Sequence, residues 1–239
     1  MIQARFSKFL TSARSIKNAP PPTLSEVVFL GRSNVGKSTL INEILESNLA
    51  KSSSTPGKTK LINFFSTQWL KSSTKICEQI SQDLTLDSSA TVTFCIIDLP
   101  GIGYAKVSKE ELKQWQKNLW EFILARSSIK LFLHLIDARH TNLEIDFALK
   151  ERVKSIIKPD QAYLQVFTKA DKLSKNDLAK LHQKNMQNNA IIIAYKDKIP
   201  QKYGSKATLR EAIFNCILGN HNQTLNINNN ICHQLDLSK

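Results

Sequence analysis

The sequence predicts an α/β fold in which helices cover both faces of a mostly parallel, six-stranded sheet. Apolar runs of strand length alternate with longer segments whose apolar residues recur every three or four positions. Five of the seven glycines fall in three short segments, at positions 31, 36, 57, 101 and 103. Glycine permits positive φ and lets an anion approach backbone N–H groups, so this distribution indicates loops that wrap a polyphosphate.

The six expected strands are short apolar runs. They cover residues 27–30, 61–65, 91–97, 129–136, 162–167 and 190–194. Helices are expected between them, at residues 38–46, 109–126, 143–157, 174–187 and 206–218. In the second of these helices an apolar stripe should face the core; it consists of Leu112, Trp115, Leu119 and Phe122.

The chain is expected to fold as one domain. Its 239 residues, 41% hydrophobic and 22% charged, suffice for one well-buried core and are few for two. Residues 1–25 are a basic N-terminal extension ending in three prolines, residues 26–218 the domain, and residues 219–239 an Asn-rich flexible tail. Residues 68–90 are an insertion between the second and third strands, in which a short helical segment fits residues 76–84.

Charge points to an anionic partner. The formal net charge is +13, and residues 1–25 contain Arg5, Lys8, Arg14 and Lys17 without any acid. Such an excess favours nucleic acid first and an acidic membrane second. No apolar run approaches the roughly 18 residues of a membrane span, so we expect a soluble, cytoplasmic protein with no membrane partner.

The cysteines fit the same compartment. They lie at positions 77, 95, 216 and 232, with no C-x-x-C pair and no His at zinc-finger spacing. This spacing argues against a metal site of their own and suits a reducing cytosol. The basic, acid-free start of the chain also describes an organellar transit peptide, which stays open as an alternative.

The first glycine segment matches the phosphate-binding P-loop. It reads Gly31, Arg32, Ser33, Asn34, Val35, Gly36, Lys37 and Ser38, and it stands directly between a predicted strand and a predicted helix. In that context the loop N–H groups and the helix N-terminus face phosphate oxygens. Lys37 should reach the β and γ phosphates, and the Ser38 hydroxyl should ligate Mg²⁺.

A second phosphate-site motif follows the third predicted strand. It reads Asp98, Leu99, Pro100 and Gly101, so its carboxylate lies at the carboxyl end of a strand, where open α/β sheets bind ligands. Asp98 is expected to hold Mg²⁺ through water, and the Gly101 N–H to sense the γ phosphate.

The segment before the second strand should complete the metal shell. Its candidate nucleotide-contacting residues are Gly57, Lys58, Thr59, Lys60 and Leu61. Thr59 is the expected hydroxyl ligand because it lies just before the strand, with Thr55 as the alternative. A plain surface loop is the competing interpretation of this segment.

The base is read by a motif after the fifth strand. It consists of Thr168, Lys169, Ala170 and Asp171. The Asp171 carboxylate can accept both donors on one edge of guanine, whereas adenine offers no such pair. Lys169 is expected to lie along the base through its aliphatic stem. These features predict GTP and GDP as ligands.

With these motifs in place, the chain resembles the EngB-type (YihA-type) GTP-binding proteins, members of the translation-factor-like (TRAFAC) GTPases. The resemblance covers about residues 9–218 and rests on the four motifs together with residues 63–65 and 103–106, Asn-Phe-Phe and Gly-Tyr-Ala-Lys. It implies a Ras-like P-loop GTPase domain and a Mg²⁺-dependent switch that assists large ribosomal subunit assembly and is tied to cell division and septation. The implied partner is the subunit precursor and its RNA; we expect a monomer and no DNA.

The chain departs from this family in two places. Residues 68–90 replace a short hairpin. The final guanine-contacting segment, Ile193, Ala194 and Tyr195, lacks the usual pair of small hydroxyl residues. Backbone contacts to guanine from this segment remain available, but side-chain contacts are doubtful.

Hydrolysis is expected to use Lys37, Thr59, Gly101 and Asn34. Ile102 occupies the position where Ras-like GTPases place a water-orienting glutamine, so intrinsic turnover should be slow. In related GTPases a P-loop asparagine, here Asn34, helps to hold K⁺, and we expect K⁺ to raise turnover. Arg32 is expected to face solvent in a structural or RNA-facing role, with an internal arginine finger as the alternative.

Three other functions stay open at this point. An ATP-using P-loop enzyme would make the motif at residues 168–171 accidental. A nucleotide-gated RNA-binding module with negligible turnover is favoured by Ile102. A sister GTPase of tRNA modification would carry additional domains.

Overall fold

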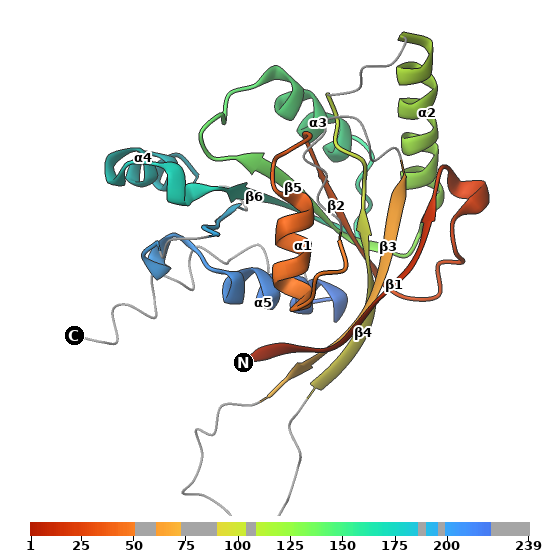
Figure 1. Ribbon diagram of the computed structural model, residues 1–239, viewed down its shortest axis with the longest axis horizontal. Helices are drawn as coiled ribbons and strands as arrows, with labels where there is room; N and C mark the ends of the chain where they lie inside the picture. The colour runs from red at the N-terminus through yellow and green to blue at the C-terminus, as the bar shows by residue number, and fades with distance from the viewer. Residues whose placement is uncertain (51–60, 73–89, 104–108, 186–189, 196–198, 221–239) are drawn as a thin grey trace, which may run out of the picture.

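The computed structural model describes residues 1–50, 61–72, 90–103, 109–185, 190–195 and 199–220. These residues form one sheet with helices on both faces (Figure 1). The mostly parallel α/β fold expected from the alternation of strands and helices is confirmed.

The sheet contains seven strands in the order β1-β3-β4-β2-β5-β6-β7. The strands are β1 (Ile2–Ala13), β2 (Glu26–Gly31), β3 (Ile62–Lys71), β4 (Ala90–Asp98), β5 (Ile129–Asp137), β6 (Ala162–Thr168) and β7 (Ala190–Ile192). Neighbours from β4 to β7 are parallel, whereas β1 with β3 and β3 with β4 are antiparallel.

The expected count of six strands is wrong because β1 lies within the region taken as an extension. Ile2 and Ala13 are buried at its two ends, but most side chains between them are polar, basic or exposed, as suits an edge strand. Register shifts between Ala4 and Phe6 and between Phe9 and Thr11 also interrupt the regular alternation of side chains between the two faces of the sheet. The alternating pattern that marks a strand was therefore too short in this region to predict β1.

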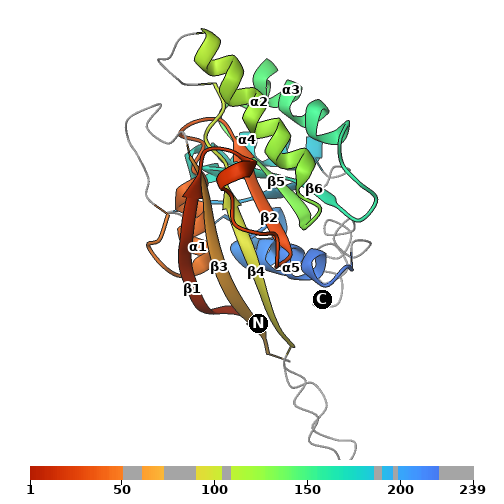
Figure 2. The same cartoon turned by 90° about the vertical axis from the view of Figure 1, so that its right-hand side faces the viewer.

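In the described part of the chain, five α-helices cover the sheet. They are α1 (Lys37–Leu45), α2 (Lys109–Ala125), α3 (Glu144–Lys154), α4 (Lys175–Asn185) and α5 (Lys206–Ile217), accompanied by short 3₁₀ helices at Ile16–Asn18, Ala170–Lys172 and Gln201–Tyr203. One core lies between the sheet and α1 and α5, a second between the sheet and α2 and α3, and a third beneath α4 (Figure 2). Leu119 and Phe122 of the expected stripe are buried in the second core.

A buried ion pair anchors the start of β2. The Arg126 guanidinium binds the Glu26 carboxylate, with side-chain exposures of 1% and 2%, and also donates to the Pro20 carbonyl at 2.9 Å. Ser128 Oγ donates to Glu26 Oε2 at 2.6 Å. The guanidinium also lies over the Phe64 and Phe122 rings, so charge, hydrogen bonds and packing are satisfied together.

The hairpin formed by β3 and β4 takes in part of the expected insertion. The two strands stay paired as far as Lys71 and Ala90. The segment expected to be helical at residues 76–84 lies outside the described residues.

Candidate functional site

The motif loops converge at the carboxyl ends of the parallel strands. The P-loop leads from Gly31 at the end of β2 to Lys37 at the start of α1, β4 ends at Asp98, and β6 ends at Thr168. Because β4, β2, β5 and β6 are consecutive parallel neighbours, these ends share one edge of the sheet.

The P-loop backbone turns through the left-handed region at two points. Asn34 has φ 60° and Gly36 has φ 103°. The positive φ favours glycine at position 36, and a Cβ there would lie 2.7 Å from the hydroxyl of Tyr195, which packs against it. The backbone conformation and the contact with Tyr195 together define the shape of the P-loop.

Lys37 and Asp98 form the charged floor of the site. Lys37 is buried, and its ammonium donates to the carbonyls of Gly31 at 3.4 Å and Arg32 at 3.2 Å. Burial lowers the pKa of Lys37, and the nearby Asp98 carboxylate opposes that shift. Burial also raises the pKa of Asp98 to about 6, against the influence of Lys37 and a hydrogen bond from Asn63.

The chemistry of this floor fits a hard divalent cation bound with a nucleotide. The buried Asp98 Oδ1 has no hydrogen-bond partner among the described residues, and Ser38 lies in the first turn of α1. No group of three His, Cys, Asp or Glu side chains in the described part of the chain could hold a metal alone. Mg²⁺ commonly takes one or two protein oxygens and completes its shell with phosphates and water.

The Asp98 loop packs directly on the P-loop. Ile102 N donates to Gly31 O at 3.1 Å, and Ser33 N donates to Ile102 O at 3.3 Å. A Cβ on Gly101 would lie 2.6 Å from Ser33 Oγ, so only glycine allows this approach. The sequence did not reveal this parallel contact between the two loops.

The guanine motif is tied to the same loop. Thr168 Oγ1 donates to Val35 O at 2.7 Å, and Lys169 Nζ donates to Asn34 O at 2.6 Å. Lys169 Nζ also lies 3.0 Å from Asp137 Oδ2. Burial alone would raise the pKa of Asp137, but hydrogen bonds from Arg139 and Lys169 hold it well below its usual value.

Asp171 and Tyr195 close the base side of the site. The Asp171 side chain is 3% exposed, and its Oδ1 accepts a hydrogen bond from Tyr195 N at 3.1 Å. Ala170 N donates to Ile193 O at 3.2 Å, which joins the two guanine-motif loops. The Tyr195 hydroxyl donates to Gly36 O at 3.0 Å. Tyr195, which stands where the family usually has a small hydroxyl residue, therefore contacts the P-loop.

Arg32 does not face solvent as expected. Its side chain is 17% exposed, and Nε donates to both carboxylate oxygens of Asp146 on α3, whose own exposure is 3%. A carboxylate buried to this degree requires a positive partner, and Arg32 supplies it. The structural interpretation of Arg32 is thus the one its contacts support. Asp146 and Asp137 carry no motif that sequence reasoning could have recognised.

Part of the expected site lies outside the described residues. These positions are Thr55, Gly57, Lys58, Thr59, Lys60 and Lys106. Leu61 is described and half-buried, directly before β3, and Asn34 is exposed on the P-loop. The hydroxyl ligand expected from Thr59 stays a prediction.

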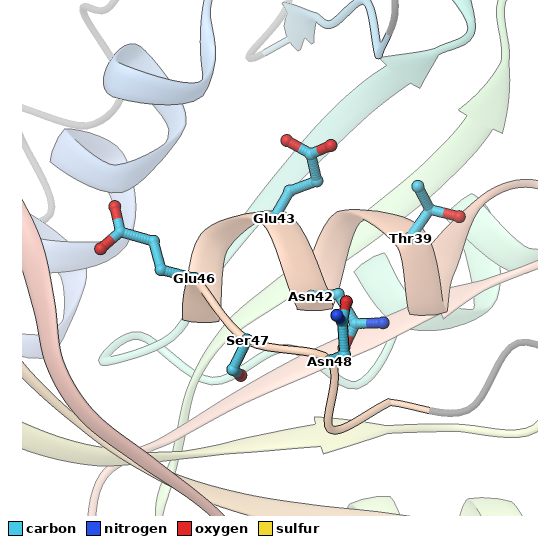
Figure 3. Close-up of a pocket in the computed structure, with 6 residues that line it drawn as sticks. All are labelled: Thr39, Asn42, Glu43, Glu46, Ser47 and Asn48. Atoms are coloured by element: carbon cyan, nitrogen blue, oxygen red, sulfur yellow. The ribbon is translucent and has the colours of Figure 1, made fainter.

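A polar pocket of about 460 Å³ lies along α1 and the turn after it (Figure 3). It is lined by Thr39, Asn42, Glu43, Glu46, Ser47 and Asn48. Glu43 is ion-paired with Lys206, and Glu46 with Arg210, so both acids connect α1 to α5. None of its lining residues belongs to the phosphate loop.

Known proteins similar to this chain are GTP-binding proteins, in agreement with the motifs of the site. A family model described as 50S ribosome-binding GTPase matches residues 26–196. A probable GTP-binding protein EngB from Helicobacter pylori strain J99 is 46% identical over 220 residues, 92% of this chain and 99% of the relative. The chain belongs to the EngB family of GTP-binding proteins. It is accordingly a GTPase, as the motifs predict.

Other EngB comparisons agree. An EngB protein from Helicobacter hepaticus is 44% identical over 95% of this chain and 92% of its own length. A crystal structure of a probable EngB shares the fold with a TM-score of 0.50 and 21% identity, covering 81% of this chain and 98% of the other. In the described part of this EngB chain, no helix is long and apolar enough to cross a membrane.

Proposed function

We propose that this EngB GTPase is a Mg²⁺-dependent switch in large ribosomal subunit assembly in the cytoplasm, and that normal cell division and septation depend on it. The observation that supports it most directly is the convergence of Lys37, Asp98 and Asp171 at one sheet edge, joined by bonds among their loops. The matched family's description as 50S ribosome-binding and the net charge of +13 support the partner.

The residues of this chain have separate tasks in that proposal. Lys37 and the P-loop N–H groups bind the phosphates, Ser38 and Asp98 hold Mg²⁺, and Asp171 accepts the two guanine donors. Bound Mg²⁺ would neutralise charge on the β and γ phosphates. Ile102 has no polar side chain with which to orient water, so turnover is slow without an activator.

We propose that K⁺ compensates in part for the missing water-orienting side chain at position 102. Asn34 is exposed, and its backbone is held in the left-handed region by the Lys169 bond to its carbonyl. Its amide side chain is therefore free of that bond and is a candidate K⁺ ligand. Equal hydrolysis rates in potassium and sodium buffers would argue against this part of the proposal.

The switch would act through the contact between the two phosphate loops. Ser33 N and Gly31 O are bonded to Ile102, next to the Gly101 amide expected to sense the γ phosphate. Drawing Gly101 toward that phosphate would change the bonds that Ile102 makes with Gly31 and Ser33. Loss of the γ phosphate would restore them.

The ribosomal part is tested by sedimentation. The protein is loaded with a non-hydrolysable GTP analogue or with GDP and run with large-subunit precursor particles over a series of salt concentrations. Co-sedimentation should be stronger with the GTP analogue and should weaken steeply as salt rises. Equal binding in both nucleotide states, or binding that salt does not affect, would refute a GTP-dependent RNA switch.

A further inference from the structure

One face of the β1–β3–β4 end of the sheet carries no helix among the described residues. Figure 2 shows the lower parts of these strands with α1 and α5 behind them and α2 and α3 only above. On the covered side Trp69 and Phe94 are fully buried and pack edge to face at 4.9 Å. On the opposite side, no helix of the described residues covers the lower parts of the three strands.

Strand register identifies the side chains of this open face. Phe6 stands beside Gln68, and Gln68 beside Thr93. The bond from Gln68 Nε2 to Thr93 Oγ1, 3.4 Å long, confirms that these two side chains share a side. Lys8 pairs with Ser66 in the next row along. Ser66 itself is buried, so we give the name open sheet face to the exposed residues Phe6, Lys8, Gln68 and Thr93.

Phe6 is the centre of the open sheet face. Its side chain is 56% exposed, although it is an aromatic residue in the middle of a strand. Lys8, Gln68 and Thr93 around it are exposed as well. More than half of the Phe6 side chain is exposed to solvent, so its ring is available to a ligand.

The chemistry around Phe6 is basic and hydrogen-bonding. Arg5 and Lys8 are exposed, no acid occurs in residues 1–25, and the open sheet face contains no Asp or Glu. Phe6 is the one aromatic side chain of this set, and Leu70, two residues from Gln68 along β3, is already half-buried, so the set is poor in the apolar area that a protein interface core needs. It matches a nucleic-acid strand, whose bases stack on aromatic rings while phosphates meet Lys and Arg.

The edge of β1 is also unsuited to adding a strand from a second copy. The register shifts at Ala4–Phe6 and Phe9–Thr11 interrupt the regular ladder along this edge. Bulges of this kind protect edge strands from pairing with other chains. Binding through side chains is therefore favoured over binding through the backbone.

We propose that the open sheet face binds a single-stranded segment of RNA, with one base stacked on Phe6 and a phosphate held by Lys8. This inference rests on the proposed ribosomal function and deepens it, because it assigns a surface to the RNA partner. The surface is distinct from the nucleotide site, so its loss should leave nucleotide binding intact.

Two matched pairs of variants test the proposal. Phe6→Ala is compared with Phe147→Ala, since Phe147 on α3 is 66% exposed. Lys8→Ala is compared with Lys117→Ala, whose side chain on α2 is 67% exposed. The full chain, loaded with a GTP analogue, is titrated into a fluorescein-labelled 12-nucleotide single-stranded RNA, and anisotropy gives Kd. Mant-GTP affinity and the melting temperature establish that each variant is folded.

Phe6→Ala should weaken RNA binding about 5- to 100-fold, the usual effect of losing one stacked base. Lys8→Ala should reduce the slope of log K against log salt by about 0.7, the value for one phosphate of a single strand. Phe147→Ala and Lys117→Ala should bind as wild type does. Equal losses in both members of a pair would overturn the proposal.

A parallel sedimentation with precursor particles separates the two proposals. If wild type binds particles in a GTP-dependent way and Phe6→Ala does so equally well, the open sheet face is refuted and the ribosomal function stands. If wild type fails to bind particles, the ribosomal function fails, and with it this assignment of its RNA partner. If Phe6→Ala instead loses binding to a protein partner but keeps RNA binding, the surface is a protein interface and the proposal is wrong.

Discussion

Arg32 of the P-loop and Asp146 of α3 form a salt bridge, in which Nε of Arg32 lies 3.1 Å and 2.9 Å from the two carboxylate oxygens. The Arg32 backbone also pairs with Ile102 in the loop after β4. One residue thus joins the P-loop, the Asp98 loop and α3. His134, fully buried in β5, has Nε2 3.7 Å from Asp146 and hydrogen-bonds Tyr163, which extends the connection into the sheet.

Asp146→Asn should lower GTP hydrolysis more than it lowers mant-GTP affinity. The substitution leaves the largely buried Arg32 guanidinium without its charge partner, so Arg32 should turn toward solvent and loosen its pairing with Ile102. We expect a loss of about 1–3 kcal/mol in the free energy of unfolding, less than for a fully buried pair because Arg32 is 17% exposed.

Single-turnover hydrolysis, mant-GTP titration and urea unfolding measure the effects of Asp146→Asn. Glu144→Gln is the matched control, because it removes an exposed carboxylate from the same helical turn. A variant that lost stability without any change in the ratio of hydrolysis to affinity would show that Asp146 only supports the fold.

Asp171→Asn should exchange the base preference. An amide cannot accept both guanine donors, whereas it can donate to the carbonyl that xanthine carries in place of the exocyclic amine. Mant-GTP binding should fall by at least about 100-fold, corresponding to about 3 kcal/mol, and xanthosine triphosphate should bind in its place.

The measurement for Asp171→Asn is a competition titration with GTP, ATP and xanthosine triphosphate. Asp177→Asn, in the first turn of α4, provides the control and should keep GTP preference. Loss of all nucleotide binding without recovery by the xanthine compound would contradict a direct base contact.

Asp137 should make the protein acid-sensitive. Its pKa is lowered in the folded chain by Arg139 and Lys169, so its carboxylate stabilises the fold above the unfolded-state pKa of about 3.9. That stabilisation is lost as the pH falls below about 4 toward the folded-state pKa. Urea unfolding between pH 3 and 7 should show it as a difference between wild type and Asp137→Asn that shrinks in acid. A difference independent of pH would refute it.

Arg126→Ala should be among the most destabilising single changes in the chain. It leaves the Glu26 carboxylate buried and unpaired, which costs about 3–5 kcal/mol. Arg152→Ala removes an exposed arginine that also lies over an aromatic ring, that of Trp120, and should cost less than about 1 kcal/mol. Thermal or urea unfolding compares them. Similar losses in the two variants would show that ring contact rather than buried charge dominates.

The sequence specified the parallel part of the sheet because its strands are buried on both faces and read as continuous apolar runs, such as Val27 to Leu30. The phosphate and guanine motifs were readable for a related reason: backbone turns and carboxylates at strand ends leave few alternatives. Each motif depends on neighbours in the chain.

The features that the sequence did not reveal depend on neighbours in space. β1 was missed because an edge strand with one open face keeps polar and basic side chains, as Arg5 and Lys8 show. The Arg32–Asp146 pair joins residues 114 positions apart, and the Tyr195–Gly36 bond residues 159 apart. The sequence around each of these residues gives no indication of its distant partner.

Arg210 on α5 donates to the carbonyls of Ile2, Glu43 and Ile44, so β1, α1 and α5 are joined by one guanidinium. On the ribosome, β1 is made before β3 and α5, so it must wait for β3 to supply its ladder and for α5 to supply Arg210. Such long-range closure slows folding and leaves the early segment exposed meanwhile. A nascent chain of this protein is therefore expected to complete this end of the sheet only after α5 has left the exit tunnel.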